Sequence, residues 1–154
     1  MNYKNTICII LIIIMIYMSI KDLLEKKVGL RELLIYLFIS IINFYIRINK
    51  ENMLFDFYAL LLSMIVGIIV VGLSIITREG IGKADAIFFI INAFNFYWYE
   101  NLYIFICGLF FSCIISLFVF IFKKNKKVGV NNIFIPFFPC VLPFVLQVLF
   151  KNWI

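Results

Sequence analysis

The sequence predicts an all-α membrane protein with about six transmembrane helices. The chain of 154 residues is 66% hydrophobic and 14% charged, and its mean hydropathy is +1.13. Soluble domains are nearer to about 45–50% apolar and about 25% charged residues. The composition therefore indicates an integral membrane protein. The regular alternation of apolar and polar residues that a membrane barrel requires is missing, which leaves helices as the spanning elements.

Six apolar segments justify the number of helices, and they lie at 5–21, 31–48, 54–77, 85–99, 101–122 and 132–150. About 20 apolar residues cross a bilayer, so six spans with short loops fill one membrane-embedded domain over 1–154. The first segment lacks a small-residue cleavage site and is predicted to be a retained span. The fourth is short for a full crossing. Tilt, partial embedding or a turn inside the bilayer would each accommodate it.

The basic residues predict the orientation of these spans. Of the 14 lysines and arginines, ten lie at the first, third and fifth connections and four on the other side. Because basic loops stay in the cytoplasm, we expect these three connections to be cytoplasmic and both termini to be outside. The net charge of +6 is then explained by topology and by contact with anionic membrane lipids. No nucleic-acid partner is predicted.

Two acidic residues stand at the ends of apolar segments. Asp22 follows the first segment, and Asp85 begins the fourth. Carboxylates at the edge of the hydrocarbon layer are costly unless they pair, face water or take part in chemistry. With intact spans between them, both acids fall on the same face of the membrane in either orientation. Two such carboxylates are the minimal set of catalytic groups that an aspartyl protease needs.

The chemistry of peptide hydrolysis explains why two carboxylates are needed. A base must activate water, and an acid must protonate the carbonyl oxygen or the leaving amine. Two close carboxylates share a proton, so that one acts as the base and the other as the acid. The chain has no histidine, which excludes a serine–histidine triad and a histidine-bound metal. Its four cysteines form no CxxC motif and are predicted to be buried thiols. Neither a metal nor a cofactor is predicted.

Structural roles for these acids stay open. Asp22 alone fits a solvated loop charge, and Asp85 alone fits a helix cap. Asp56 and Glu100 fall on the opposite face and are expected to be interfacial or capping. Three further acids share the face of Asp22, lie in expected loops and remain backup candidates: Glu25, Glu32 and Glu79.

Three stretches together resemble the type IV prepilin peptidases, which belong to the GxGD-type intramembrane aspartyl proteases. The stretch DLLEKKVGL at 22–30 is similar to the catalytic Asp of the family with the basic stretch and turn that follow it. The stretch GIGKADAI at 80–87 is similar to the motif G-x-G-x-G-D-x-K. The stretch IPFFP at 135–139 is similar to the final-span motif I-P-F-x-P.

The resemblance implies that Asp22 and Asp85 are catalytic. Ala84 replaces a glycine of the motif and Ile87 replaces its lysine, with Lys83 close by to supply that charge. The substrate-binding loop and groove would then consist of Gly80, Gly82, Lys83, Ala84, Pro136 and Pro139. The prolines of the last segment either kink a packed helix or free backbone groups that line a wet groove.

The implied activity is removal of the short basic leader from prepilins or pseudopilins, with cleavage after a glycine at the cytoplasmic face of the bacterial cytoplasmic membrane. Longer members carry a CxxC-containing cytoplasmic region that is associated with N-methylation. The first loop of this chain is too short for such a region, so the chain resembles the minimal, peptidase-only form. The implied partners are a prepilin-like membrane protein and lipids; no oligomeric state is predicted.

Two other readings of the sequence remain. One is a related GxGD protease that acts on a preflagellin or a peptide-signal precursor. The other is a non-enzymatic scaffold or transport subunit in which the acids serve as an ion or proton site. A neighbouring gene for a pilin-like protein would favour the peptidase, and proton-dependent flux in vesicles would favour the transport subunit.

Overall fold

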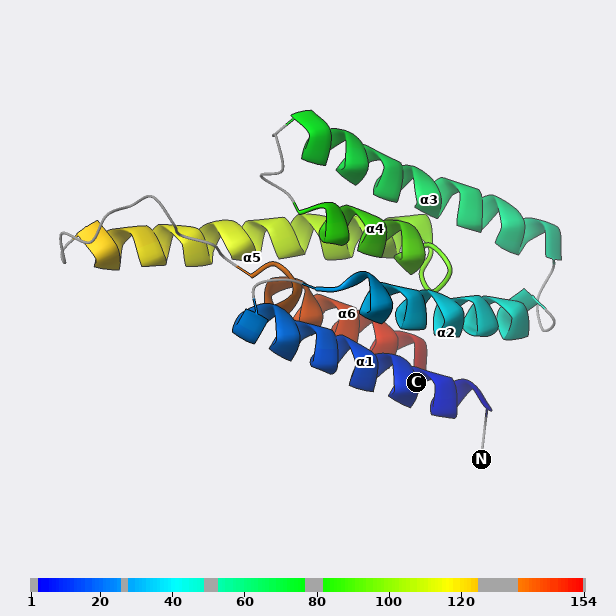
Figure 1. Cartoon of the computed structure of the whole chain (residues 1–154). Coiled ribbons are helices and arrows are strands. Elements are labelled where there is room, and N and C mark those ends of the chain that lie inside the picture. Colours follow the sequence, from blue (N-terminus) through cyan, green and yellow to red (C-terminus); the bar gives the residue numbers. More distant parts are fainter. Residues whose placement is uncertain (1–2, 26–27, 49–52, 77–81, 125–135, 154) are drawn as a thin grey trace.

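The computed structural model describes residues 3–25, 28–48, 53–76, 82–124 and 136–153. Within these ranges the chain is helical and forms no strand, which confirms the predicted fold class (Figure 1). The helices are α1 (Tyr3–Glu25), α2 (Leu30–Ile48), α3 (Met53–Ile76), α4 (Lys83–Asn92), α5 (Trp98–Lys124) and α6 (Phe138–Trp153).

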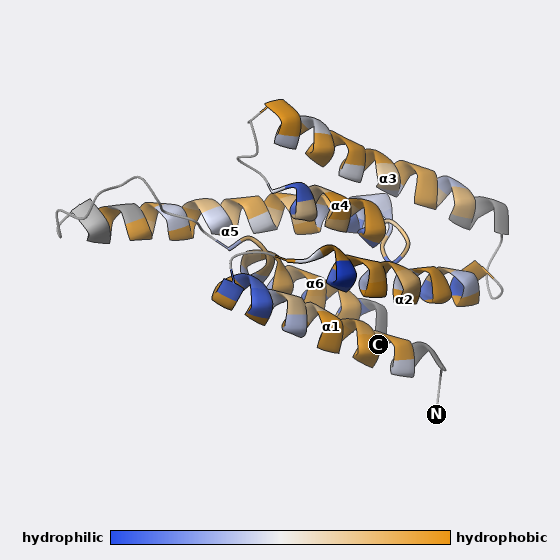
Figure 2. Ribbon diagram, in the orientation of Figure 1, coloured by the Kyte–Doolittle hydropathy of each residue, from blue (hydrophilic) through white to orange (hydrophobic). Residues whose placement is uncertain are grey.

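The described helices include three that are long and apolar enough to cross a membrane, namely Thr6–Glu25, Phe57–Ile76 and Trp98–Val119. A shorter apolar helix covers Phe138–Lys151. Figure 2 shows that the helices are mostly hydrophobic along their length, while the end of α1 and the starts of α2 and α4 are hydrophilic. The outward-facing surfaces carry many large apolar side chains, as expected for helices that face lipid. The protein is therefore membrane-embedded.

The fourth helix is shorter than predicted. The sequence favours one apolar segment over 85–99, but α4 ends at Asn92 and α5 begins at Trp98. Short-range backbone bonds close the turn between them, such as that from the Phe94 N–H to the Ile91 carbonyl at 3.1 Å. At about 1.5 Å per residue, the 10 residues of α4 span only about half of the hydrocarbon core. The helix α4 is thus a half-length element inside the bundle.

The last helix also starts later than predicted. Of the expected segment 132–150, residues 132–135 lie outside the described part of the chain, and α6 begins at Phe138. The Phe137 carbonyl accepts the first helical bond, from the Val141 N–H at 3.2 Å. Pro139 is tolerated in this first turn because its missing N–H would have no helical partner there.

The main hydrophobic core draws side chains from all six described helices. Helix α4 packs against α2, α3 and α5, while α1 packs against α2 and α6. Aromatic rings connect these elements: Phe88 of α4 lies 5.5 Å from Tyr36 of α2 and 5.0 Å from Phe138 of α6, between ring centroids. The start of α1 and the end of α6 lie at the same side of the molecule (Figure 1).

Helices α3 and α4 approach each other closely at Gly67. A Cβ atom at this position would lie 2.7 Å from the Ile90 backbone nitrogen, a contact that no side chain could make. Small residues at such crossings let membrane helices pack backbone against backbone. This contact holds the short helix α4 against a full-length span.

A buried amide network holds the far end of α4. It consists of Tyr36, Ser40 and Asn43 of α2 with Asn92 and Asn95 at the end of α4. The Tyr36 hydroxyl donates to Asn92 Oδ1 at 2.6 Å, and Asn95 Nδ2 donates to Ser40 Oγ at 2.8 Å and to the Tyr36 hydroxyl at 3.2 Å. Asn43 Nδ2 donates to Asn95 Oδ1 at 3.1 Å. These bonds explain why the helix stops before 99: the Asn95 side chain is tied to α2.

Candidate active site

Asp22 lies in the last turn of α1, and its side chain reaches the start of α6. The residue is only 5% exposed. Its Oδ2 accepts a hydrogen bond of 3.1 Å from the backbone N–H of Phe138. Because Phe138 is the first residue of α6, that N–H has no partner within its own helix. Asp22 therefore caps α6 from a different helix and joins segments 116 positions apart.

Asp85 lies in the first turn of α4, beside the N-cap residue Gly82. Its backbone N–H and that of Ala86 both bond the Gly82 carbonyl, at 3.1 and 3.2 Å. The Asp85 carboxylate folds back over Gly82, where an added Cβ would lie 2.9 Å from Asp85 Oδ2. A negative charge at this position is stabilised by the helix dipole. The half-buried carboxylate thus lies against Gly82, where the side chain of an alanine would displace it.

The two acids lie at the same end of the helix bundle, within range of an electrostatic interaction between their carboxylates. A ring contact between α4 and α6 supports this arrangement, because the Phe88 and Phe138 rings lie 5.0 Å apart between centroids. Phe88 is three residues after Asp85, and the Phe138 N–H is bound to Asp22. Parts of the three stretches at 22–30, 80–87 and 135–139 therefore meet at one end of the helix bundle.

The predicted loop residues lie around Asp85. Gly82 is the N-cap of α4 and Lys83 is its exposed first residue. Ala84 is half-buried and packs against the main core, so a small side chain suits this position. Gly80 lies outside the described residues.

The prolines lie on the side of Asp22. Pro136 and Pro139 are half-buried and flank Phe138, and the Pro136 carbonyl accepts a bond from Cys140 Sγ at 3.4 Å. Pro143 lies inside α6. Since proline has no N–H, the carbonyl of Pro139, four residues earlier, has no helical donor. One backbone acceptor is therefore released next to the residue that binds Asp22.

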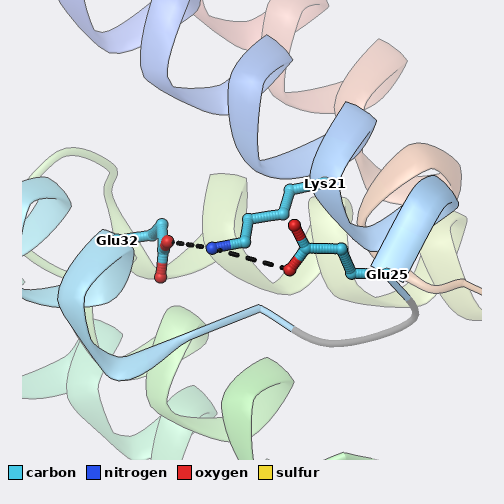
Figure 3. Close-up of polar contacts among 3 residues, drawn as sticks. All are labelled: Lys21, Glu25 and Glu32. Carbon is cyan, nitrogen blue, oxygen red and sulfur yellow. Dashed lines mark hydrogen bonds and ion pairs between the residues drawn. The ribbon is translucent and has the colours of Figure 1, made fainter.

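The remaining acidic residues lie in different environments. Glu32 was expected in a loop, but it lies buried in the first turn of α2. It pairs with Lys21, which also lies 3.7 Å from the exposed Glu25 (Figure 3). Glu100 is a capping residue, as expected, because its Oε2 accepts the Tyr97 N–H at 3.0 Å. Glu79 lies outside the described residues, and Asp56 belongs to the first turn of α3.

All four cysteines lie in the described part of the chain, and none forms a disulfide. Cys8 and Cys140 are buried as predicted, but Cys107 is half-buried and Cys113 is exposed on α5. The prediction of four buried thiols is therefore wrong for two of them, because the outer face of a lipid-facing helix also accepts a small apolar thiol. Within the described residues, no three Cys, Asp or Glu side chains gather closely enough to hold a metal ion.

Two features of the site were not predicted. One is the bond from the Phe138 N–H to Asp22, which leaves no mark in the sequence because every residue except proline has such a group. The other is the pair of Lys21 and Glu32. This pair could have been predicted from the sequence, because the two residues carry opposite charges and lie on either side of the short connection between α1 and α2.

Comparison with known proteins gave no match to a protein-family model, a curated protein or a solved structure. The function proposed for the site therefore depends on the residues and the geometry of this chain and on the resemblance of its motifs.

Proposed function

We propose that this protein is a membrane aspartyl endopeptidase that uses Asp22 and Asp85 to hydrolyse a peptide bond. The observation that supports the proposal is that different helices place these two carboxylates at one end of an apolar bundle, within range of an electrostatic interaction. Acidic side chains in such surroundings are retained mainly for function. The resemblance to type IV prepilin peptidases names the reaction: cleavage of a prepilin-like or pseudopilin-like leader after glycine.

The two carboxylates supply both proton transfers of the reaction. The ionised one removes a proton from water, and the resulting hydroxide adds to the scissile carbonyl carbon. The protonated one donates its proton to the carbonyl oxygen. When the C–N bond breaks, the proton taken from water passes to the leaving amine, and a hydroxyl proton of the tetrahedral diol returns to the other carboxylate. The carboxylic acid product forms, and the original protonation pattern is restored. Water is the nucleophile, so no covalent intermediate forms.

The surroundings of the two acids suit a peptide substrate. The backbone of a substrate strand needs hydrogen-bond partners, and the Pro139 carbonyl lacks its helical donor because of Pro143. Gly82 keeps the approach to Asp85 free of a side chain. The basic bias of the connections favours placing this end of the bundle at the cytoplasmic face of the bacterial cytoplasmic membrane, where a leader would lie.

The most serious competitor is a non-enzymatic subunit in which the acids are structural or bind a proton. The observation in its favour is that Asp22 caps α6, which is a sufficient structural reason for an acid. Asparagine separates the two roles: its side-chain oxygen can still accept the Phe138 N–H, but it cannot act as a base.

The test compares Asp22→Asn with Asp22→Ala. We expect Asp22→Asn to keep membrane insertion and thermal stability and to lose at least about 10²-fold in kcat/KM. Asp22→Ala should lose both activity and the cap, which costs about 1 kcal/mol. Cleavage of prepilin-like substrates by purified protein in detergent measures the first effect, and thermal unfolding measures the second.

Asp56→Asn, which changes an acid near the start of α3, is the matched control and should be close to neutral. Turnover by Asp22→Asn at the wild-type rate would leave only the capping role and refute the proposal. Proton flux in vesicles that needs Asp22, without any cleavage, would favour the transport subunit instead.

A further inference from the structure

A second pair of charged residues lies beside Asp22. Lys21 Nζ contacts the Glu32 carboxylate across the connection between α1 and α2, and it lies 3.7 Å from Glu25 Oε2 (Figure 3). The side chain of Glu32 is only 11% exposed and that of Lys21 21%, whereas that of Glu25 is 62% exposed. Lys21 thus has one sheltered partner and one solvated partner, and only the sheltered pair is expected to hold its geometry.

The Glu32 carboxylate is held at the start of α2. Glu32 lies in the first turn of α2, where the helix dipole favours a negative charge. Its Oε2 lies against Gly29, so closely that a Cβ there would collide with it. Gly29 also accepts the first bond of α2, from the Leu33 N–H at 3.4 Å. Glu32 therefore joins the start of α2 to Lys21 rather than pointing into solvent.

Lys21 and Asp22 are neighbours, so their side chains point about 100° apart around α1. One contacts α2 through Glu32, and the other contacts α6 through the Phe138 N–H. The last turn of α1 is thereby held on two faces. Rotation of that turn would break both contacts at once.

We propose that Lys21 and Glu32 are positioning residues: their ion pair fixes the last turn of α1 and so places the Asp22 carboxylate against the Phe138 N–H, at the end of the bundle that also carries Asp85. The kinetic part of this inference rests on the proposed peptidase function, whereas its structural part does not. Neither residue touches the reacting atoms. The pair acts through the helix that carries Asp22.

The structural part is tested by crosslinking. Cys140 lies two residues after Phe138, whose N–H binds the Asp22 carboxylate at 3.1 Å, so Asp22→Cys, with Cys8, Cys107 and Cys113 changed to alanine, gives a single thiol pair. Copper-phenanthroline should oxidise this pair in native membranes. Glu32→Gln should slow the disulfide formation at least about fivefold, because a 1 Å displacement strongly affects reactions between close groups. Glu25→Gln, the matched control, should leave the rate unchanged.

The kinetic part uses the same changes in the enzyme that retains Asp22. Glu32→Gln and Lys21→Met should each lower kcat about 10-fold or more, with KM changed less than about twofold, because the substrate still binds while the base is misplaced. The charge exchange Lys21→Glu with Glu32→Lys should restore kcat to within about threefold. It is made together with Glu25→Gln, so that the new acid at position 21 meets no repulsion.

The results separate the two claims. If Glu32→Gln leaves the crosslinking rate unchanged, or if the charge exchange recovers neither crosslinking nor kcat, the positioning role is refuted. If crosslinking falls and recovers as expected but the wild-type protein cleaves none of the prepilin-like substrates, the positioning role stands and the peptidase assignment fails. A Glu32→Gln variant that does not insert into the membrane is replaced by Lys21→Met in the same crosslinking assay.

Discussion

The two ends of α4 are built from different chemistry. At its start, Asp85 is half-buried, lies over Gly82 and faces the charge of Asp22. At its end, Asn92 is fully buried, and with Asn95 it joins the amide network to α2. One end carries charge that its neighbours only partly compensate, and the other carries neutral groups that bond one another.

This difference suggests two uses of buried polar groups in a membrane protein. Neutral groups stabilise the packing of helices, and charged groups suit the chemistry that we propose. Neutral amides and hydroxyls act both as donors and as acceptors, so they can bond each other in a low-dielectric interior, as Tyr36, Ser40 and Asn95 do. Two carboxylates share no such complementarity, and holding them close is unfavourable unless a proton is shared. The amide end therefore anchors α4, and the carboxylate end is the one to which we assign the proposed reaction.

The largest effect is expected from Asp85→Asn at the start of α4. The variant keeps the size and the helix-start position of the side chain, but it cannot exchange a proton. We expect kcat/KM to fall at least about 10²-fold, with thermal stability within about 0.5 kcal/mol of wild type. Substrate cleavage and thermal unfolding in detergent measure the two quantities. If Asp85→Asn lost stability together with activity, Asp85 would also have a structural role. The contrast between the two ends of α4 would then be wrong.

A smaller effect is expected from Gly82→Ala. The added Cβ would lie 2.9 Å from Asp85 Oδ2, and the flexible carboxylate can yield at little cost in stability. We expect a loss of about 10-fold in kcat, because the reacting group is displaced. The control is Gly72→Ala, where nothing lies within 4 Å of the added Cβ. Equal activity of the two variants would show that the position of the carboxylate over Gly82 is unimportant.

The smallest effect on activity is expected at the amide end. Asn95→Ala removes the bonds to Tyr36, Ser40 and Asn43. We expect unfolding to become easier by about 1–2 kcal/mol, while kcat at low temperature stays within about threefold of wild type. Thermal unfolding and a cleavage assay at 20 °C (about room temperature) test this. If Asn95→Ala lost as much activity as Asp85→Asn, the amide end and the carboxylate end of α4 would not have separate roles.

Much of the fold could be predicted because it follows from solvation. A chain of this hydropathy must satisfy its backbone within helices, and the lengths of the apolar runs set the number of helices. The helix ends were harder to predict. The turn that separates α4 from α5 depends on the bonds of Asn95 to α2, and such bonds between distant segments have no local signature.

The sequence by itself determined the membrane class, the helical architecture and the two acids at the ends of apolar segments, because composition, hydrophobic run length and charge act locally. Only the tertiary structure decided which groups those acids meet. The Phe138 N–H reaches Asp22 and Lys21 reaches Glu32, because the packing of α1 against α2 and α6 selects one partner among many equivalent groups. Directional contacts depend on that packing, whereas burial of apolar surface depends mainly on how much of it the chain contains.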